Sequence, residues 1–175
     1  TREFSALYQQ KPQPEEGVYF KREWFNRYAV GQQPKNTNKY GAGDYAVSDG
    51  EGDFSEEGVI EVDTDKNIWF TDWWSGQTSP DIWIESTIDL QLKHKPECWL
   101  AESGVIKRSV EPFLKSRMEQ RNSWTVLEWL PTSGDKRAMA RSFQGMAAAG
   151  KVYIPLCEWG DALIDQLIRF DSGVY

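Results

Sequence analysis

Cysteine and histidine are scarce in this sequence of 175 residues, which contains two cysteines and one histidine. Cys98 and Cys157 are too few and too far apart to indicate a disulfide framework or a zinc site, so a reducing interior is expected. His94 has no second histidine to form a metal cluster or a catalytic pair with. Its place at the end of a predicted helix favours a surface cation there.

Long apolar runs are also missing, because none approaches the roughly 18 residues that a membrane span requires. The first residues show no signal-peptide pattern. The sequence lacks a Gly-x-Ser-x-Gly elbow, a phosphate-binding Gly-x4-Gly-Lys-Ser/Thr loop and a dinucleotide fingerprint. These absences argue against a membrane protein, a serine hydrolase of that type and a nucleotide-binding domain.

The sequence also lacks an excess of positive charge, because its formal net charge is −7. A general nucleic-acid binder usually has an obvious basic surface, which this value disfavours. The basic residues are nevertheless partly grouped. One predicted helix carries Lys107, Arg108, Lys115, Arg117 and Arg121, and the next carries Lys136, Arg137 and Arg141. Solvated helix faces are the alternative interpretation of both groups, so charge alone does not decide between them.

What is present indicates one folded domain with a substantial core. Hydrophobic residues make up 39% of the sequence and aromatic residues 14%. Single domains commonly contain ~100–200 residues. Residues 1–37 show little periodicity and are predicted to be an entry segment, so that the folded domain spans residues 38–175.

Hydrophobic periodicity predicts a mixed α/β sheet in which three antiparallel strands precede parallel ones, flanked by helices. The predicted strands are 40–47, 58–62, 67–74, 98–101, 124–129 and 152–154, and the predicted helices are 80–95, 105–120, 135–149 and 158–169. Ser79 and Pro80 fit the start of the first helix, and Gly150 fits the end of the third. The helix at 105–120 is expected to bury Val110, Phe113, Leu114 and Met118.

Two carboxylates follow short apolar strands and are the strongest candidates for chemistry. Asp49 follows the first predicted strand, and Glu102 follows the strand at 98–101. If these two strands are parallel neighbours, the side chains meet at one edge of the sheet. Clustered carboxylates can hold two Mg²⁺ or Mn²⁺ ions for phosphodiester cleavage.

The alternative is structural: Asp49 shapes a turn through its own backbone, and Glu102 is an ordinary charge at a strand end. Asp53 is a weaker candidate, with turn chemistry or a role behind the metal ligands.

Several segments, taken in order, resemble the C-terminal nuclease domain of the large terminase subunit of tailed phages and prophages. They are FSALYQQKP at 4–12, GVYF at 17–20, YAVSD at 45–49, GDFS at 52–55, LAESG at 100–104, DKRA at 135–138, GKVYIP at 150–155 and FDSG at 170–173. Together they extend over nearly the whole chain.

The resemblance implies an RNase H-like fold and a metal-dependent endonuclease that cuts concatemeric double-stranded DNA with two Mg²⁺ or Mn²⁺ ions. Asp49 and Glu102 match its first two acidic ligands. Candidate DNA-binding residues are Lys107, Arg108, Lys136 and Arg137.

The implied partners are DNA, a preceding ATPase domain joined through residues 1–37, a portal and a small terminase subunit. The implied location is the host cytoplasm, with no membrane and no secretion.

One departure concerns the third acidic ligand, which the family carries in an Asp-Asp pair expected just after Tyr175. Asp171 does not stand at the matching position, so the third ligand is absent from these residues. The 175-residue chain is therefore expected to bind metal weakly and to cut poorly.

Two other functions stay open. A resolvase or transposase-like nuclease of the same fold would normally have a more basic surface. A DNA-binding or assembly module with an inactive acidic site would bind DNA without cutting it.

Overall fold

The computed structural model describes residues 19–46, 54–103, 105–131 and 136–170, without the side chains of residues 105, 106 and 136–139. The chain divides into two compact units. One comprises residues 34–65 and 69–133, and the other comprises residues 1–33, 66–68 and 134–175. Each unit has its own strands and helices.

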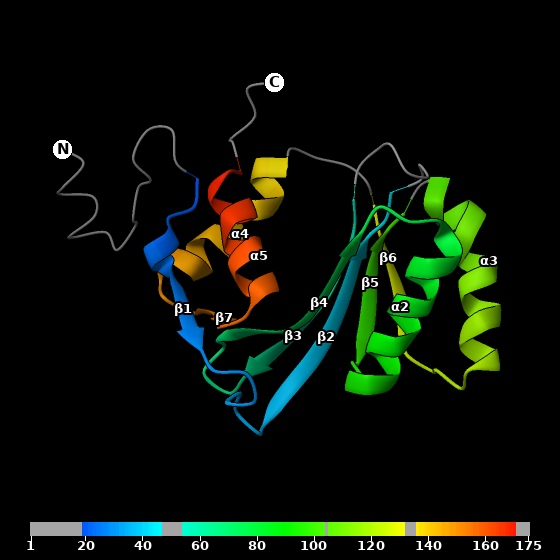
Figure 1. Ribbon diagram of the computed structural model, residues 1–175, viewed down its shortest axis with the longest axis horizontal. Helices are drawn as coiled ribbons and strands as arrows, with labels where there is room; N and C mark the ends of the chain where they lie inside the picture. The colour runs from blue at the N-terminus through cyan, green and yellow to red at the C-terminus, as the bar shows by residue number, and fades with distance from the viewer. Residues whose placement is uncertain (1–18, 47–53, 104, 132–135, 171–175) are drawn as a thin grey trace. The chain divides into compact units, whose positions relative to one another are not determined.

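The first unit contains a sheet with the strand order β4-β3-β2-β5-β6 (Figure 1). Its strands are β2 (Thr37–Asp44), β3 (Ser55–Asp63), β4 (Ile68–Gly76, in this unit from residue 69), β5 (Cys98–Glu102) and β6 (Val126–Leu130). β2 pairs with β3 in antiparallel fashion, whereas β2 with β5 and β5 with β6 are parallel pairs. The predicted mixed α/β sheet is confirmed.

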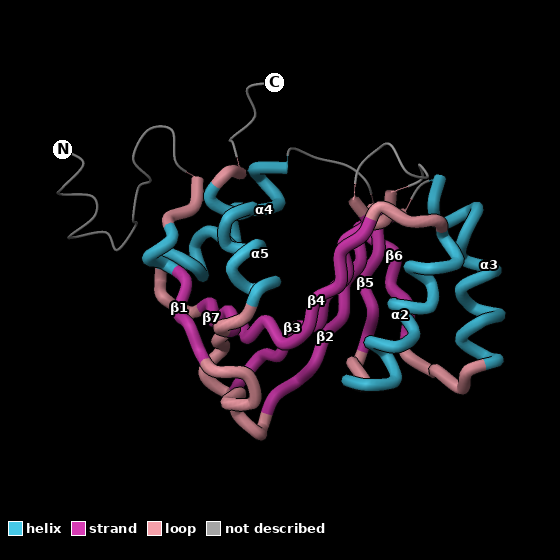
Figure 2. Tube along the Cα trace, viewed as in Figure 1, coloured by secondary structure: helices cyan, strands magenta, loops and turns pink. Residues whose placement is uncertain are grey.

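Two helices, α2 (Pro80–His94) and α3 (Val105–Gln120), accompany this sheet (Figure 2). Pro80 stands in the first turn of α2, where its missing N–H costs nothing. Ile88 and Leu114 are almost fully buried and pack in one cluster with Ala101 of β5. The two helices therefore cover the face of the sheet to which Ala101 points.

Strand β2 contains glycines that weaken a strand in isolation, and the packing explains one of them. A Cβ added at Gly41 would lie 2.0 Å from the Trp99 ring, so only glycine leaves room for this buried indole. The first strand was predicted at 40–47. It runs over Thr37–Asp44 instead and therefore ends before Asp49.

Two details of the sequence prediction around α3 are wrong. Phe113 was expected to face inward but is 68% exposed, whereas Val110, Leu114 and Met118 are buried as predicted. The strand predicted at 124–129 is β6, two residues later at its start, and Trp124 is exposed. Amphipathic spacing alone cannot decide whether a side chain at the margin of a helix face is buried or exposed.

The second unit contains a 3-10 turn η1 (Arg22–Trp24), strands β1 (Phe25–Tyr28) and β7 (Val152–Pro155), and helices α4 (Lys136–Ala148) and α5 (Glu158–Ile168). β1 and β7 are parallel, with Phe25 opposite Val152. Buried Phe20 contacts the rings of Phe25 and Phe143. β1 was not predicted, because four residues within a segment of low periodicity carry too little pattern.

Helix α4 ends as the sequence predicts. Gly150 adopts a positive φ of 68°, and its N–H donates to Ala147 O at 2.8 Å, which is a typical glycine helix end. Within the described ranges, every helix is too short or too polar to cross a lipid bilayer.

Candidate functional site

The parallel strands β2, β5 and β6 end side by side (Figure 1). Gly43 lies opposite Ala101, and Glu102 lies opposite Leu130. Beyond the strands, Ser103 N donates to Leu130 O at 2.6 Å, so the pairing continues past Glu102. We call this end of the sheet the carboxyl edge. In open α/β sheets, sites commonly form beyond the carboxyl ends of the strands.

Two carboxylates stand next to each other at the carboxyl edge. Gly43 of β2 lies opposite Ala101 of β5, and the next residues along the two parallel strands are Asp44 and Glu102. Because Ala101 points into the core, alternation turns Glu102 and Asp44 toward the other face. Both side chains are exposed, and neither forms a hydrogen bond or ion pair with another described residue. We call Asp44 and Glu102 the carboxylate pair.

The structure places only part of the predicted site. Glu102 lies at the carboxyl edge, and β2 and β5 are the parallel neighbours that the prediction required. Asp49 and Asp53 lie outside the described residues, so their predicted roles stay predictions. Among the residues that are described, no three His, Cys, Asp or Glu side chains gather into a group that could hold a metal ion.

Sequence reasoning missed Asp44. The strand prediction carried β2 as far as residue 47, which placed Asp44 inside the strand rather than at its end. No local pattern marks this end of β2, because the contacts of Gly41 with the Trp99 ring and of Gly43 with the Tyr45 ring are visible only in the folded protein.

A third carboxylate near this edge already has partners. Glu56 lies opposite Asp44 in the antiparallel pairing of β2 with β3. Its two oxygens accept hydrogen bonds from Trp73 Nε1 at 2.6 Å and Ser75 Oγ at 2.8 Å. Glu56 is therefore held by β4 rather than free to bind a ligand.

The basic side chains of α3 and of Arg121, which directly follows it, differ in how far they are neutralised. Arg117 pairs with Glu85, and Arg121 contacts Glu85 and Asp89, both at 2.8 Å. In contrast, Arg108 is exposed and forms no ion pair within the described part of the chain.

Lys107 lies near the carboxyl edge. Its Nζ is 5.7 Å from the ring centroid of Trp129, the residue of β6 that lies opposite Ala101. Lys136 and Arg137 begin α4, and their side chains are outside the described parts.

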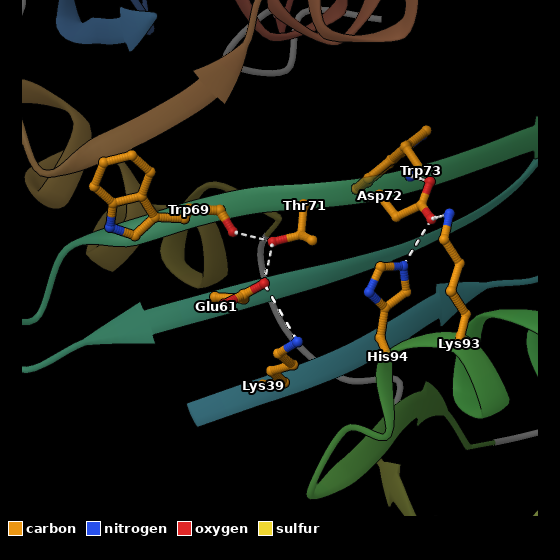
Figure 3. A network of polar contacts seen from close by, with 8 residues as sticks. All are labelled: Lys39, Glu61, Trp69, Thr71, Asp72, Trp73, Lys93 and His94. Atoms are coloured by element: carbon orange, nitrogen blue, oxygen red, sulfur yellow. Dashed lines mark hydrogen bonds and ion pairs between the residues drawn. The ribbon is translucent and has the colours of Figure 1, made fainter. Parts of the chain in front are cut away.

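His94 is not on the surface, where the sequence prediction placed it. Its side chain is 11% exposed, and its Nε2 lies 2.7 Å from Asp72 Oδ2 (Figure 3). Lys93 Nζ contacts the same oxygen at 2.7 Å. Burial alone would raise the pKa of Asp72, but the hydrogen bonds from His94 and Lys93 outweigh it and hold this pKa at about 2. The cluster joins β4 to α2.

Figure 3 also shows a second polar group, formed by Lys39, Glu61 and Thr71 of β2, β3 and β4. Thr71 Oγ1 donates to Glu61 Oε1 at 3.2 Å, and Lys39 Nζ lies 3.7 Å from the same oxygen. These contacts satisfy a carboxylate that is 5% exposed, and they link the three strands.

Behind the carboxyl edge, on the face covered by the helices, lies a buried acid. Glu57 is fully buried in β3 and accepts a hydrogen bond from Thr87 Oγ1 at 2.7 Å. Burial raises the pKa of Glu57 to about 8, although hydroxyl groups of Thr87 and Ser86 act in the opposite direction. The side chain is therefore mostly neutral at pH 7.

Comparison with solved structures identifies the fold. The large terminase nuclease of thermophilic phage G20c with bound magnesium aligns with a TM-score of 0.65 and 12% identity, over 90% of this chain and 82% of that one. The nuclease domain of the large terminase subunit gp2 of bacterial virus Sf6 aligns with a TM-score of 0.57 and 10% identity, over 87% of this chain and 81% of that one. The G20c nuclease is also known with bound zinc and bound cobalt. No family model and no curated protein sequence matches the chain.

Proposed function

We propose that this protein, which has the fold of large terminase nucleases, is a metal-dependent endonuclease that cuts double-stranded DNA. The observation that carries the proposal is the carboxylate pair, which is exposed where the parallel strands β2 and β5 end and has no side-chain partner among the described residues. The similar G20c nuclease binds magnesium, zinc and cobalt, which supports a divalent-metal site in this fold.

The carboxylate pair fits a hard divalent cation. Mg²⁺ prefers oxygen ligands, keeps several waters and is commonly bound through one or two carboxylates. Asp44 and Glu102 would hold it, while Glu56 is already engaged by Trp73 and Ser75. Two Mg²⁺ or Mn²⁺ ions, when bound, supply an activated water and stabilise the leaving oxygen of the phosphodiester.

Asp44 and Asp49 compete for the role of first ligand. The register of β2 and β5 favours Asp44, because it stands beside Glu102 at the carboxyl edge. The resemblance to the terminase motif favours Asp49. Asp53 keeps its proposed place behind the ligands.

The DNA would approach from the end of the sheet where β2, β5 and β6 stop. Lys107 lies over Trp129 near this end, and Arg108 is exposed and unpaired within the described residues. These two cations would contact phosphates, which contributes affinity without sequence information. Lys136 and Arg137 are proposed as DNA contacts on the basis of the sequence resemblance alone.

In the cell, we infer a role in packaging, with cuts in concatemeric viral DNA inside the host cytoplasm. An ATPase domain, a portal and a small terminase subunit are the partners that this role requires. The terminase fold supports this role more strongly than a resolvase-like one.

Cleavage of supercoiled plasmid in Mn²⁺ tests the proposal. The wild-type protein is expected to cut slowly, in keeping with the two acidic ligands found among its residues, and EDTA is expected to abolish this cutting. Glu102→Gln and one of Asp44→Asn and Asp49→Asn are expected to cut at least about tenfold more slowly, since even residues behind metal ligands have effects of this size. Glu128→Gln is the matched control, because Glu128 is an exposed glutamate in the middle of β6.

Equal cutting by all variants would mean a contaminant or a different site. DNA binding without cutting, unchanged by Glu102→Gln, would favour a binding module with an inactive acidic site.

A further inference from the structure

A chain of four buried side chains lies behind the carboxylate pair. Trp99 Nε1 of β5 donates to Tyr45 Oη at 2.9 Å, and Tyr45 Oη lies 3.1 Å from Thr87 Oγ1 of α2. Thr87 Oγ1 donates to Glu57 Oε1 of β3 at 2.7 Å. All four residues are at most 4% exposed. We call Trp99, Tyr45, Thr87 and Glu57 the buried relay.

The chemistry of these groups gives the relay one direction. An indole N–H only donates, so the Tyr45 oxygen accepts a hydrogen bond from Trp99. The Tyr45 hydroxyl in turn donates a hydrogen bond to Thr87. The Thr87 hydroxyl then donates a hydrogen bond to Glu57, which is the last acceptor of the relay. Loss of any hydroxyl therefore leaves a buried donor or acceptor unsatisfied, which is costly away from water.

The relay lies on the same two strands as the carboxylate pair, through Tyr45 just after β2 and Trp99 in β5. Tyr45 follows Asp44 in the chain, and Trp99 precedes Glu102 by three residues in β5. The Tyr45 ring stacks on Trp83 with centroids 4.1 Å apart, and it occupies the space that a Cβ at Gly43 would need. The bond from Trp99 to Tyr45 thus fixes the end of β2 against β5, on the face opposite to the pair.

Glu57 is the adjustable end of the relay. Its second oxygen, Oε2, is buried and has no hydrogen-bond partner in the described part of the protein. The groups that face it are the hydroxyls of Ser86 and Thr87 from α2 and the phenol of Tyr45 after β2. None of these is a cation, so an ionised Glu57 would be a buried and uncompensated charge.

We propose that Glu57, acting through Thr87 and Tyr45, is a positioning residue that sets the placement of Asp44 beside Glu102 for metal binding. Glu57 itself contacts neither metal nor DNA in this role. The neutral carboxyl accepts from Thr87 without placing a charge in the core, whereas ionisation would bury an uncompensated charge at the end of the relay. The inference rests on the proposed nuclease function and names a residue of its site that no comparison assigns.

The first test compares the pH profiles of plasmid cutting by the wild type and Glu57→Gln in Mn²⁺. Glutamine keeps the carbonyl acceptor and cannot ionise. Near pH 7 the two rates are expected to agree within about threefold. Between pH 7 and 9 the rate of the wild type relative to Glu57→Gln is expected to fall about tenfold, which is the change in the neutral fraction of a group with a pKa of about 8.

The second test removes the middle hydroxyl with Tyr45→Phe and keeps the ring that stacks on Trp83. The Mn²⁺ concentration for half-maximal cutting is expected to rise at least about fivefold, because metal affinity depends on groups that orient its ligands. Tyr40→Phe is the matched control, since Tyr40 is a half-buried tyrosine of β2 outside the relay. It is expected to leave the Mn²⁺ dependence unchanged.

The outcomes separate this inference from the proposed function. A wild-type protein that neither cuts DNA nor binds Mn²⁺ overturns both. A wild-type protein that cuts, with pH profiles that coincide for Glu57→Gln and with Tyr45→Phe equal to Tyr40→Phe, overturns the positioning role alone. If Glu57→Gln fails to fold, the Tyr45→Phe comparison decides.

Discussion

At the scale of single residues, the most unusual side chain is a glutamate that is fully buried and stays neutral near pH 7. Glu57 has a pKa raised to about 8 by burial, far above the ordinary value of about 4.5. Native proteins seldom bury a carboxyl group without complete hydrogen bonding, and such groups often serve a function. We therefore predict that Glu57 makes the stability of the folded protein depend on pH.

The sign of that dependence follows from linkage. Between the ordinary pKa and the raised pKa, the unfolded chain loses the Glu57 proton while the folded protein keeps it, so stability falls as pH rises from about 4.5 to 8. The Glu57→Gln variant has no ionisable group at this position, so it does not lose stability in this way as pH rises. Its free energy of unfolding relative to wild type is expected to rise by a few kcal/mol between pH 4.5 and 8. Urea unfolding at several pH values measures this, and a constant difference would contradict it.

Asp72 gives the opposite dependence. Its pKa of about 2 means that its ionised form stabilises the fold above pH 4, and that this contribution is lost as pH falls from about 4 to 2. Asp72→Asn is expected to destabilise the protein by about 1 kcal/mol at pH 6, after allowance for solvent screening.

The difference between Asp72→Asn and wild type should shrink toward pH 2 in thermal unfolding. Asp81→Asn, in the exposed first turn of α2, serves as a control. A difference that is the same at pH 6 and pH 2 would show that His94 and Lys93 do not hold the Asp72 charge.

At the scale of elements, β2 decides both the fold and the site. Its glycines let Trp99 and Tyr45 lie against the strand, and its last residue is Asp44. Sequence reasoning recovered most elements, including α3 at its observed bounds. It failed on the end of β2, because ring packing across strands is a tertiary effect that local propensity does not contain.

Gly41→Ala tests the ring packing. The new Cβ would lie 2.0 Å from the Trp99 ring, so the substitution is expected to cost about 2–3 kcal/mol by overpacking. Gly145→Ala in α4 is the control, because nothing lies within 4 Å of the added Cβ and alanine favours a helix by about 1 kcal/mol. Similar stabilities of the two variants in chemical unfolding would contradict the observed packing of Trp99.

On helix α3, charge pairing predicts which basic side chains contact DNA and which do not. Arg108→Ala is expected to weaken binding to a DNA duplex and to reduce the salt dependence of binding by about one phosphate contact. Lys115→Ala should have little effect, because Lys115 is paired with Glu111 at 2.6 Å. Fluorescence anisotropy at several salt concentrations compares them, and equal losses would favour a general electrostatic effect.

At the scale of the whole molecule, the fold agrees with the sequence resemblance although identity to the similar terminase nucleases is only 10–12%. The order of elements along the chain from β2 onward and the exposed Glu102 were expected from the sequence, and the parallel pairing of β2 with β5 is the condition that the predicted site required. The choice between Asp44 and Asp49 was not, since it depends on the residue at which a strand ends. Strand ends are the least certain part of any prediction from pattern.

The central claim is that carboxylates at the carboxyl edge hold the metal ion. Calorimetric titration of Mn²⁺ into the wild-type protein, Glu102→Gln and Glu128→Gln tests it directly and without DNA. The account predicts that Glu102→Gln weakens Mn²⁺ binding at least about tenfold, whereas Glu128→Gln binds like the wild type. Equal Mn²⁺ affinity in all three proteins would contradict the account and place the metal elsewhere.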